Sequence, residues 1–552
     1  MTGRRIFVSL FALALAASSL AQSAPTRADA EKDPVLHAML AELDRSRQQL
    51  QLQGFDKPYF IEYRIDDVDR YAATAEYGAL TTDHGAHSRI ARVTVRVGDY
   101  KSDSSFSRGD GALELASVEN DPLAIRFALW QATDEAYKAA LNAWAQKQAN
   151  LKSVQTPPQA DDFSHEKPTV LLEPVATLDL DRAAWKQAIV DGTGLYRSDP
   201  TAKSFADDVE VSQGSVEALV RTVYLVNSEG AIIRTSQPEY RAEVALEAQA
   251  ADGMRLDRSY PVVSATGAGL GSPDQFRHGV LEALNGLRAL RDAPLVTGEY
   301  HGPVLFAGNA SARSFEEYFS HAVTASRPQL GSTARTTGPF ASSYNTRVLP
   351  DFIKIVDDPS LAEFGGKPLL GAYKVDDEGV PAQTVTLVDS GKLVGYLLGR
   401  EPVKDFPASN GHGRAPIAQP AQPHIGVLEV EATGGLTEDD LVKKLIAMGK
   451  DQGLESVYLL QAKTGPTEPR TLYRIKVADG SRELVRGARL ADVDLRSFRS
   501  DIVAVGADPY VDNVFGDEPS TIIAPPLLFD DVTVKRGEEK NEKLPYYPPP
   551  AQ

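Results

Sequence analysis

No cysteine occurs among the 552 residues of this sequence. Disulfide bonds and metal sites with thiolate ligands are therefore excluded. Apolar residues nevertheless make up 42% of the chain, which is enough to build large hydrophobic cores. Strand-like and helix-like segments both occur along this length, so we expect two large domains rather than one.

Positive charge is also scarce. Lysine and arginine number 58 against 76 aspartates and glutamates, which gives a net charge of −18 at pH 7. A strongly acidic protein repels the phosphate backbone, so nucleic acid is not an expected partner.

Long apolar runs are missing after the first 21 residues, so no transmembrane helix is expected in the rest of the chain. The N-terminus has two arginines, an apolar run from Ile6 to Ala17, and small residues before Ala21. This order is typical of a secretory signal peptide, residues 1–21, cleaved after Ala21. A retained membrane anchor is the alternative, although the run is short for crossing a bilayer. We therefore expect an exported protein, periplasmic or secreted, without membrane insertion.

Several enzyme signatures are absent as well. The sequence has no Gly-x-Ser-x-Gly nucleophile elbow and no phosphate-binding P-loop. Residues 192–196, GTGLY, do not complete the glycine fingerprint of dinucleotide-binding proteins. A Ser-His-Asp triad remains an alternative, because the members of such a triad are scattered along a sequence and leave no local motif.

The N-terminal half combines helices and strands. Aspartate before proline, at 33–34 and 121–122, marks two helix starts, because aspartate caps a helix and proline fits its first turn. Helices are expected over residues 34–52, 122–151, 180–190 and 274–291, the third capped by Asp179 or Asp181. Alternating apolar residues predict strands over residues 59–65, 71–80, 89–97, 216–226, 231–235 and 240–250. We expect an N-terminal α/β domain over residues 22–293.

The C-terminal half is richer in strands. Residues 303–306 read as a short buried strand, followed by a turn at Gly308 and Asn309 and a helix over residues 314–322. A hairpin is expected over residues 383–398. A further helix is expected over residues 437–450, with Thr437 as its cap ahead of three acidic residues.

These segments predict a β-rich C-terminal domain over residues 294–534, which carries the helix of residues 314–322. The remaining residues, 535–552, are charged and then rich in proline. Such a composition cannot bury enough apolar surface to fold, so we expect a disordered tail.

The helix over residues 314–322 carries the most distinctive chemistry, because it contains Glu316, Glu317 and His321. Glu317 and His321 are four residues apart, so a regular helix places them on one face. A carboxylate and an imidazole so placed can act together on a metal or a proton. The alternative is an ordinary Glu–His pair on a half-exposed helix.

A metal at this helix would need more ligands. Glu316 could offer a carboxylate, but it lies about 140° from His321 around a regular helix, so the two converge only if the helix is kinked. Catalytic zinc usually takes three protein ligands. The other histidines of this half, which are the candidates for the third ligand, are His301, His412 and His424.

The order of strand, turn and helix around this motif resembles the centre of the TldD/PmbA family of zinc-peptidase-like proteins. Residues 224–230, YLVNSEG, and residues 371–400, with their DDEG and DSGK turns, extend the resemblance. Active family members carry His-Glu-x-x-x-His on this helix. Here Glu316 stands in place of the first histidine, while Glu317 and His321 match the catalytic base and the second histidine.

The resemblance implies an α+β fold: a two-domain TldD/PmbA-like subunit with an N-terminal α/β domain and a β-rich C-terminal domain carrying the motif helix. It implies a homodimer, or a heterodimer with another family member, that encloses a cleft for unfolded peptide. Zinc is the implied cofactor, held by Glu316 and His321 beside Glu317 as the base. Two of the family's three expected metal ligands are missing, so a protein without any cofactor is the second expectation.

Two functions are therefore expected. The first is a metallopeptidase-like protein that acts on unfolded or extended peptides by proteolysis. The alternative is a non-catalytic, PmbA-like peptide-binding or scaffold subunit of an exported complex. In that case an extended peptide could add to the edge of a sheet, which requires main-chain hydrogen bonds and no metal.

Three other groups of residues were candidates for a site. His412 and Arg414 lie in a glycine-rich segment, where backbone can approach a ligand closely, and are predicted to bind substrate. An exposed loop histidine is the alternative for His412. Arg400 could join Arg414 in holding a peptide carboxylate. The acidic residues 376–378 fit either a calcium or magnesium cluster or an ordinary hairpin turn.

Overall fold

The computed structural model describes residues 24–105, 111–463 and 469–537. The predicted signal peptide, residues 1–21, lies outside the described residues, as does the predicted tail from residue 538 onward. Strand β24 continues to Arg536, two residues into the stretch predicted as a tail. None of the helices in the described part of the chain is long and apolar enough to cross a membrane.

The N-terminal part is built on one seven-stranded sheet of order β3-β2-β1-β5-β6-β4, with β7 also paired to β6. All neighbours are antiparallel except β4, which runs parallel to β6. The strands are β1 (Phe60–Glu76), β2 (Ala79–Arg96), β3 (Ala112–Ala116), β4 (Val170–Leu172), β5 (Val209–Asn227), β6 (Ile232–Gln249) and β7 (Arg255–Ser264).

Strand β1 corrects the prediction of two separate strands over residues 59–65 and 71–80. It pairs with β5 without a break from Glu62 to Glu76. Asp66 and Asp67, which lie between the two predicted strands, are held inside the sheet by arginines of neighbouring strands. Charge therefore does not end this strand, because each carboxylate has a partner. Strand β6 likewise joins the two segments predicted over residues 231–235 and 240–250.

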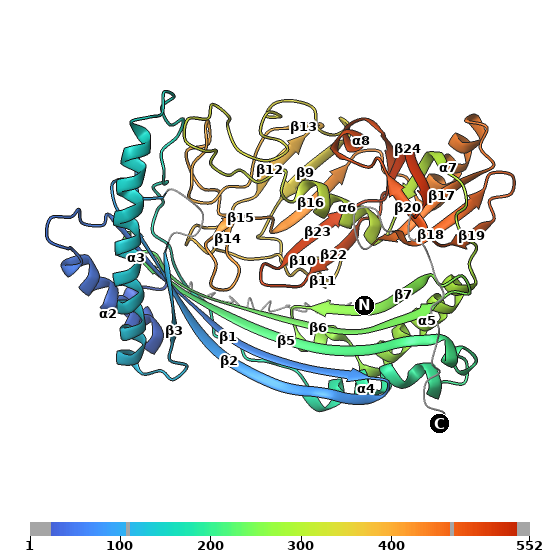
Figure 1. Ribbon diagram of the computed structural model, residues 1–552, viewed down its shortest axis with the longest axis horizontal. Coiled ribbons are helices and arrows are strands. Elements are labelled where there is room, and N and C mark those ends of the chain that lie inside the picture. The colour runs from blue at the N-terminus through green and yellow to red at the C-terminus, as the bar shows by residue number, and fades with distance from the viewer. Residues whose placement is uncertain (1–23, 106–110, 464–468, 538–552) are drawn as a thin grey trace, which may run out of the picture.

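Four helices cover one face of this sheet at its two ends (Figure 1). They are α2 (Pro34–Gln49), α3 (Pro122–Leu151), α4 (Arg182–Ser198) and α5 (Pro273–Asp292). The predicted starts are confirmed: the side chains of Asp33 and Asp121 accept backbone N–H groups of the first turns. Asp181, one of the two candidates, caps α4.

The C-terminal part has two mixed sheets with helix α6 (Asn309–Phe319) packed between them. The first contains β9 (Ile353–Asp357), β12 (Val385–Asp389), β13 (Lys392–Leu393), β16 (Val427–Ala432), β22 (Tyr510–Val514) and β23 (Ser520–Ala524). The second contains β8 (Tyr300–Phe306), β17 (Ser456–Lys463), β18 (Pro469–Lys476), β19 (Arg482–Val485), β20 (Ala488–Ala491), β21 (Ile502–Val505) and β24 (Leu527–Arg536). The predicted hairpin is β12–β13, and the predicted helix is α7 (Glu438–Asp451).

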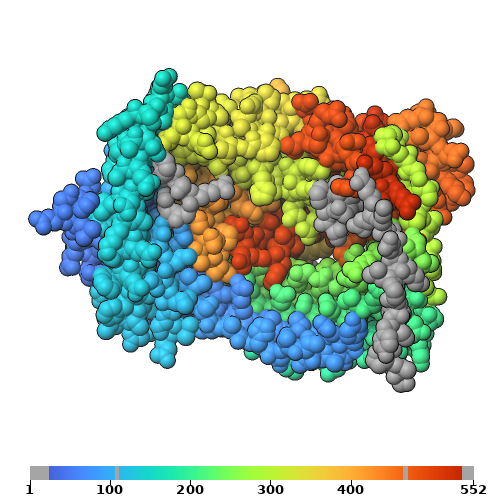
Figure 2. All heavy atoms as spheres, viewed as in Figure 1, coloured from blue at the N-terminus to red at the C-terminus, as the bar shows by residue number. Residues whose placement is uncertain are grey.

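The long N-terminal sheet curves beneath the C-terminal part, as Figure 1 shows. The surface is hollowed where the two parts face each other (Figure 2). Charged side chains cross between them: Arg221 of β5 donates to the carbonyl of Ala415, and Arg400 pairs with Glu229 at 2.7 Å. The expected α+β, two-part architecture is confirmed.

One carboxylate at this boundary makes stability depend on pH. Glu239 of β6 is only 2% exposed and accepts a hydrogen bond from the backbone of Gly516 at 3.2 Å. Burial raises the pKa of Glu239 to about 7. Because the folded state favours the protonated form, folding loses stability as the pH rises from about 4.5 to about 7.

Glu239→Gln is therefore expected to raise the free energy of unfolding at pH 8 by up to about 3 kcal/mol, with little change at pH 5. Glutamine keeps an oxygen for Gly516 and carries no charge. Urea unfolding of both proteins at the two pH values measures the difference. An equal effect of the substitution at pH 5 and pH 8 would contradict a raised pKa of Glu239 in the folded protein.

Candidate functional site

Helix α6 ends earlier than predicted. It runs from Asn309 to Phe319, with Ser320 as its C-cap, whereas the sequence suggested a helix through residue 322. The chain turns at this point and carries Val323 into the hydrophobic core. His321 lies beyond the helix and is exposed. Glu317 and His321 therefore do not share a helical face, because the last turn that would align them is not formed.

The apolar side of α6 fixes the helix in place. Phe315 and Phe319 are fully buried and contact the ring of Phe498, with centroids 5.4 and 5.5 Å from it. Burying such a side chain contributes about 1.5–3 kcal/mol. The motif carboxylates consequently point to the other, half-buried side of the helix.

Both motif glutamates are bonded to cations of the protein. Glu317 accepts a hydrogen bond from Lys463 at 2.7 Å, and this lysine is only 3% exposed. Glu316 lies 2.8 Å from Arg313, one turn earlier on the same helix. Arg313 also lies 2.7 Å from Asp512 of β22. Burial raises the pKa of Asp512 to about 6, an effect that Arg313 opposes.

This arrangement does not fit a zinc site. The residues that the structure describes contain no group of three or more histidines and carboxylates able to hold a metal ion. The two glutamates are already neutralised by a lysine and an arginine. Among the candidates for a third ligand, His412 is buried against Asp357, and His301 contacts Thr533.

His412 does not line a surface. It is 0% exposed, its Nε2 atom lies 3.1 Å from a carboxylate oxygen of Asp357, and its Nδ1 atom contacts Asn410. The alternative of an exposed loop histidine is thus wrong too. A side chain without exposed surface cannot touch a peptide, so the predicted substrate-binding role has no structural basis. The residue ties the glycine-rich segment to β9.

Arg414 and Arg400 are also held by carboxylates of the protein. Arg414 lies 3.1 Å from Asp377 and over the ring of Tyr373, at 4.1 Å from its centroid. It borders a cavity of about 190 Å³ between the two parts. Arg400 instead binds Glu229, so the two arginines do not meet around one ligand.

The acidic residues 376–378 form the hairpin turn rather than a cation site. The carboxylate of Asp376 accepts hydrogen bonds from the backbone N–H groups of Glu378, Val380 and Gly413. These bonds close the turn and join it to the glycine-rich segment. Burial raises the pKa of Asp376 well above its ordinary value, and Glu378 adds to the shift.

A second cavity was not foreseen from the sequence. It has a volume of about 320 Å³ and lies between the concave face of the long sheet and segments of the C-terminal part. Its sheet side consists of alternate residues, Phe60, Glu62 and Arg64 on β1 with Arg92, Thr94 and Arg96 on β2. The alternation was visible in the sequence, but what covers the face was not.

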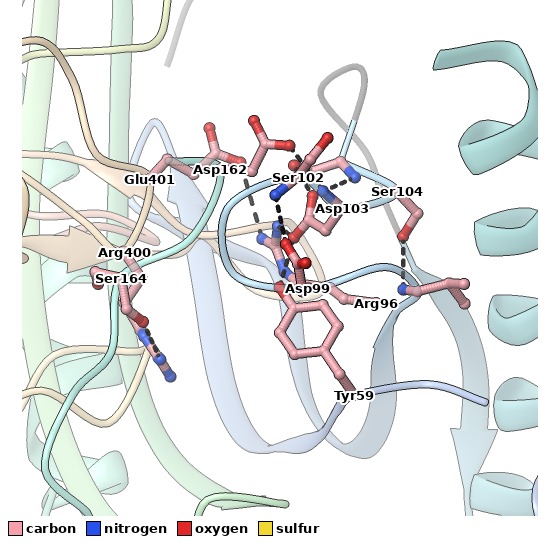
Figure 3. A network of polar contacts seen from close by, with 12 residues as sticks. Tyr59, Arg96, Asp99, Ser102, Asp103, Ser104, Asp162, Ser164, Arg400 and Glu401 are labelled. Carbon is pink, nitrogen blue, oxygen red and sulfur yellow. Dashed lines mark hydrogen bonds and ion pairs between the residues drawn. The ribbon is translucent and has the colours of Figure 1, made fainter. Parts of the chain in front are cut away.

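One wall of this cavity is an ordered polar network (Figure 3). The carboxylate of Asp103 accepts hydrogen bonds from Tyr59 at 2.7 Å and from Arg96 at 2.9 Å. Burial alone would raise the pKa of Asp103. The charge of Arg96 and the hydrogen bonds from Ser105 and Tyr59 outweigh burial and lower this pKa to about 2. Arg96 is therefore held rigidly at the cavity.

Comparisons with known proteins identify relatives of the C-terminal part. The family profile described as the PmbA/TldA metallopeptidase C-terminal domain matches residues 297–536. A metalloprotease of Archaeoglobus fulgidus is 30% identical over 162 residues, which is 28% of this chain and 32% of that protein. The match thus spans about a third of that relative.

Solved structures show the same fold over most of the chain. TldE from Thermococcus kodakarensis has a TM-score of 0.59 at 15% identity, covering 90% of this chain and 100% of its own. A candidate modulator of a DNA gyrase from Thermotoga maritima gives the same values. The C-terminal domain match and these folds lead to one conclusion: residues 297–536 form a C-terminal domain of the PmbA/TldA metallopeptidase type, in a chain whose overall fold is similar to that of TldE.

Proposed function

We propose that this protein binds extended peptides in an exported compartment and does not use its motif helix for zinc-dependent hydrolysis. The observation that carries the proposal is the state of the motif side chains. Glu317, at the position of the family's base, is paired with Lys463, and Glu316 is paired with Arg313. A carboxylate oxygen that already accepts a hydrogen bond from a buried ammonium group is not free to accept one from a substrate water.

Strand β22 is the proposed place for the peptide. It is the edge of its sheet and pairs with β23 on one side only within the described residues. It contacts α6 directly, and Asp512 of β22 is the partner of Arg313. The side chain of Asn513 accepts a hydrogen bond from the backbone of Leu370, so the chain at Leu370 lies beside this end of β22. The other half of the strand, from Tyr510 to Asp512, is the proposed place for strand addition. An edge strand offers a row of main-chain donors and acceptors to an extended chain.

A peptide-binding assay tests this proposal. Fluorescein-labelled, unstructured ten-residue peptides are titrated by anisotropy, each beside the same peptide with alternate backbone nitrogens methylated. Strand addition predicts that methylation abolishes binding, because the methyl group removes the main-chain donor. Glu317→Gln should bind as the wild type does. Equal binding of methylated peptides, or cleavage that is lost in Glu317→Gln, would contradict the proposal.

We also propose that the protein forms a homodimer through β3 and the first half of α3, which contact each other. Half of the exposed large apolar side chains of the described residues lie here: Leu113, Leu115, Val118, Leu123, Phe127 and Trp130. Contiguous exposed apolar surface of this kind marks an interaction site.

The sequence of β3 favours a second copy as the partner. It reads ALELA, the same in both directions, and β3 is the open edge of the long sheet. Two copies paired antiparallel about a two-fold axis at Glu114 would place leucine opposite leucine and alanine opposite alanine. The two Glu114 side chains would also face each other, so the apolar pairs must outweigh this repulsion. A two-fold interface must be self-complementary, which a palindromic edge strand satisfies.

Leu115→Glu and Phe127→Glu are expected to convert the dimer to a monomer, because each places a charge in the apolar contact. Phe55→Glu is the matched control, since Phe55 is 54% exposed and lies outside this surface. Light scattering coupled to size exclusion measures the mass of each variant at micromolar concentration. A monomeric wild type, or dimeric Leu115→Glu and Phe127→Glu variants, would contradict the assignment.

A further inference from the structure

The cavity of about 320 Å³ between the two parts is lined by more cations than acids. Its cations are Arg64, Arg92, Arg96, Lys147 and Arg327, and its acids are Glu62, Glu378 and Glu401. Arg64 and Arg92 lie directly opposite each other on β1 and β2. Like charges at such a position destabilise a sheet unless acceptors lie beside them, and here Arg64 donates to the carbonyl of Gln419 and Arg92 to that of Ala418.

Buried aspartates pair with four of these cations. Arg96 pairs with Asp103, Lys147 and Arg327 both pair with Asp162, and the Nε atom of Arg64 lies 3.4 Å from Asp66. The Nε atom of Arg96 is buried without a hydrogen-bond partner among the described residues. An unsatisfied buried donor costs about 1–3 kcal/mol, so the protein does not satisfy every donor of these guanidinium groups.

Glu401 lies loosely between two of these cations. Its carboxylate is 3.3 Å from Arg327 and 3.8 Å from Arg96, and the side chain is 45% exposed. Figure 3 shows Glu401 close to Arg96 and Asp162. An exposed ion pair with such spacing contributes at most about 1 kcal/mol, so a ligand can displace it.

We propose that this cavity binds a compact organic polyanion, a small molecule with two or more carboxylate or phosphate groups, and that Glu401 occupies the place of one of these groups in the free protein. Guanidinium groups bind both kinds of oxyanion through paired hydrogen bonds. The site involves neither α6 nor β22, so it is independent of peptide binding.

Glu62 couples this binding to protons. It faces Glu378 and Arg400 of the C-terminal part and Arg64 and Arg96 of the sheet. Burial, together with the charge of Glu378, raises the pKa of Glu62 to about 7. A bound polyanion raises it further, because a second negative charge disfavours the ionised carboxyl group. Binding therefore takes up a proton and weakens as the pH rises above 7.

Calorimetric titration with citrate and, separately, with pyrophosphate at constant ionic strength tests the site. Glu401→Gln removes the competing carboxylate and is expected to bind up to about fivefold more tightly than the wild type. Glu431→Gln, an exposed glutamate on β16 paired with Lys354, is the matched control and should leave affinity unchanged. A gain of affinity cannot arise from damage to the fold.

The two probes distinguish the source of the oxyanion. Tighter citrate binding assigns carboxylate ligands, and tighter pyrophosphate binding assigns phosphate ligands. At pH 8, Glu62→Gln should bind either probe more tightly than the wild type. The difference in affinity should be smaller at pH 6. Protonation of the ligand itself affects both proteins equally at a given pH, so it cancels in this comparison. No binding of either probe at about 10 mM, or unchanged or weaker binding by Glu401→Gln, would overturn the proposal.

Discussion

Replacing Asp66 by alanine is expected to lower the free energy of unfolding by about 3–5 kcal/mol. Asp66 is 0% exposed in the middle of β1. Its carboxylate accepts a hydrogen bond from Arg221 at 2.9 Å and another from the backbone of Ala418, in the C-terminal part, at 3.0 Å. Without it, the buried charge of Arg221 loses its partner, and a contact between the two parts is lost.

Guanidinium unfolding of the variant measures this loss, and Asp517→Ala is the control. Asp517 also joins the two parts, through Arg70 at 3.3 Å, but both side chains are 52% exposed. An exposed pair of this kind contributes at most about 1 kcal/mol. If Asp66→Ala and Asp517→Ala cost the same, the interface is not held by its buried charges.

His412→Ala is expected to cost about 3 kcal/mol of stability without changing the peptide affinity of the folded fraction. The imidazole is fully buried between Asp357 and Asn410, so its removal leaves a cavity and a carboxylate with one bond fewer. Peptide contact plays no part in this loss.

The same variant separates a structural role from substrate binding. Differential scanning calorimetry gives its stability, and peptide titration below the unfolding temperature gives its affinity. His301→Ala is the control, because His301 is 61% exposed and a surface change of this kind usually costs under about 0.5 kcal/mol. A stable His412→Ala protein that binds peptide poorly would restore the sequence-based prediction of a substrate residue.

Local signals in the sequence predicted the local structure well. Helix α3 begins at Pro122 and ends at Leu151 as expected, because the aspartate cap and the proline that mark its start are neighbours in the chain. A hairpin turn at residues 376–378 was one of the two predictions for that segment, because the signals for a turn are also neighbours in the chain. The family and the two-part architecture followed from a strand, a turn and a helix that are contiguous in sequence.

Features that depend on distant partners were not predictable in this way. The sequence near Glu317 does not indicate that Lys463 is its partner, because Lys463 lies on β17, 146 residues later. The continuation of β1 through Asp66 depends on Arg221, which is 155 residues away. The burial of His412 depends on β9, and the anion cavity depends on which segment covers the sheet. Spacing along the chain cannot show these contacts.

Cations of the protein, not zinc, hold the motif carboxylates of α6. Metal analysis of the purified protein by inductively coupled plasma mass spectrometry, after equilibration with excess zinc and desalting, tests it most directly. We expect no stoichiometric zinc in the wild type. The amount of zinc that the wild type retains should equal the amount that the Glu317→Gln and His321→Ala variants retain. One tightly held zinc ion per chain that disappears in either variant would contradict it.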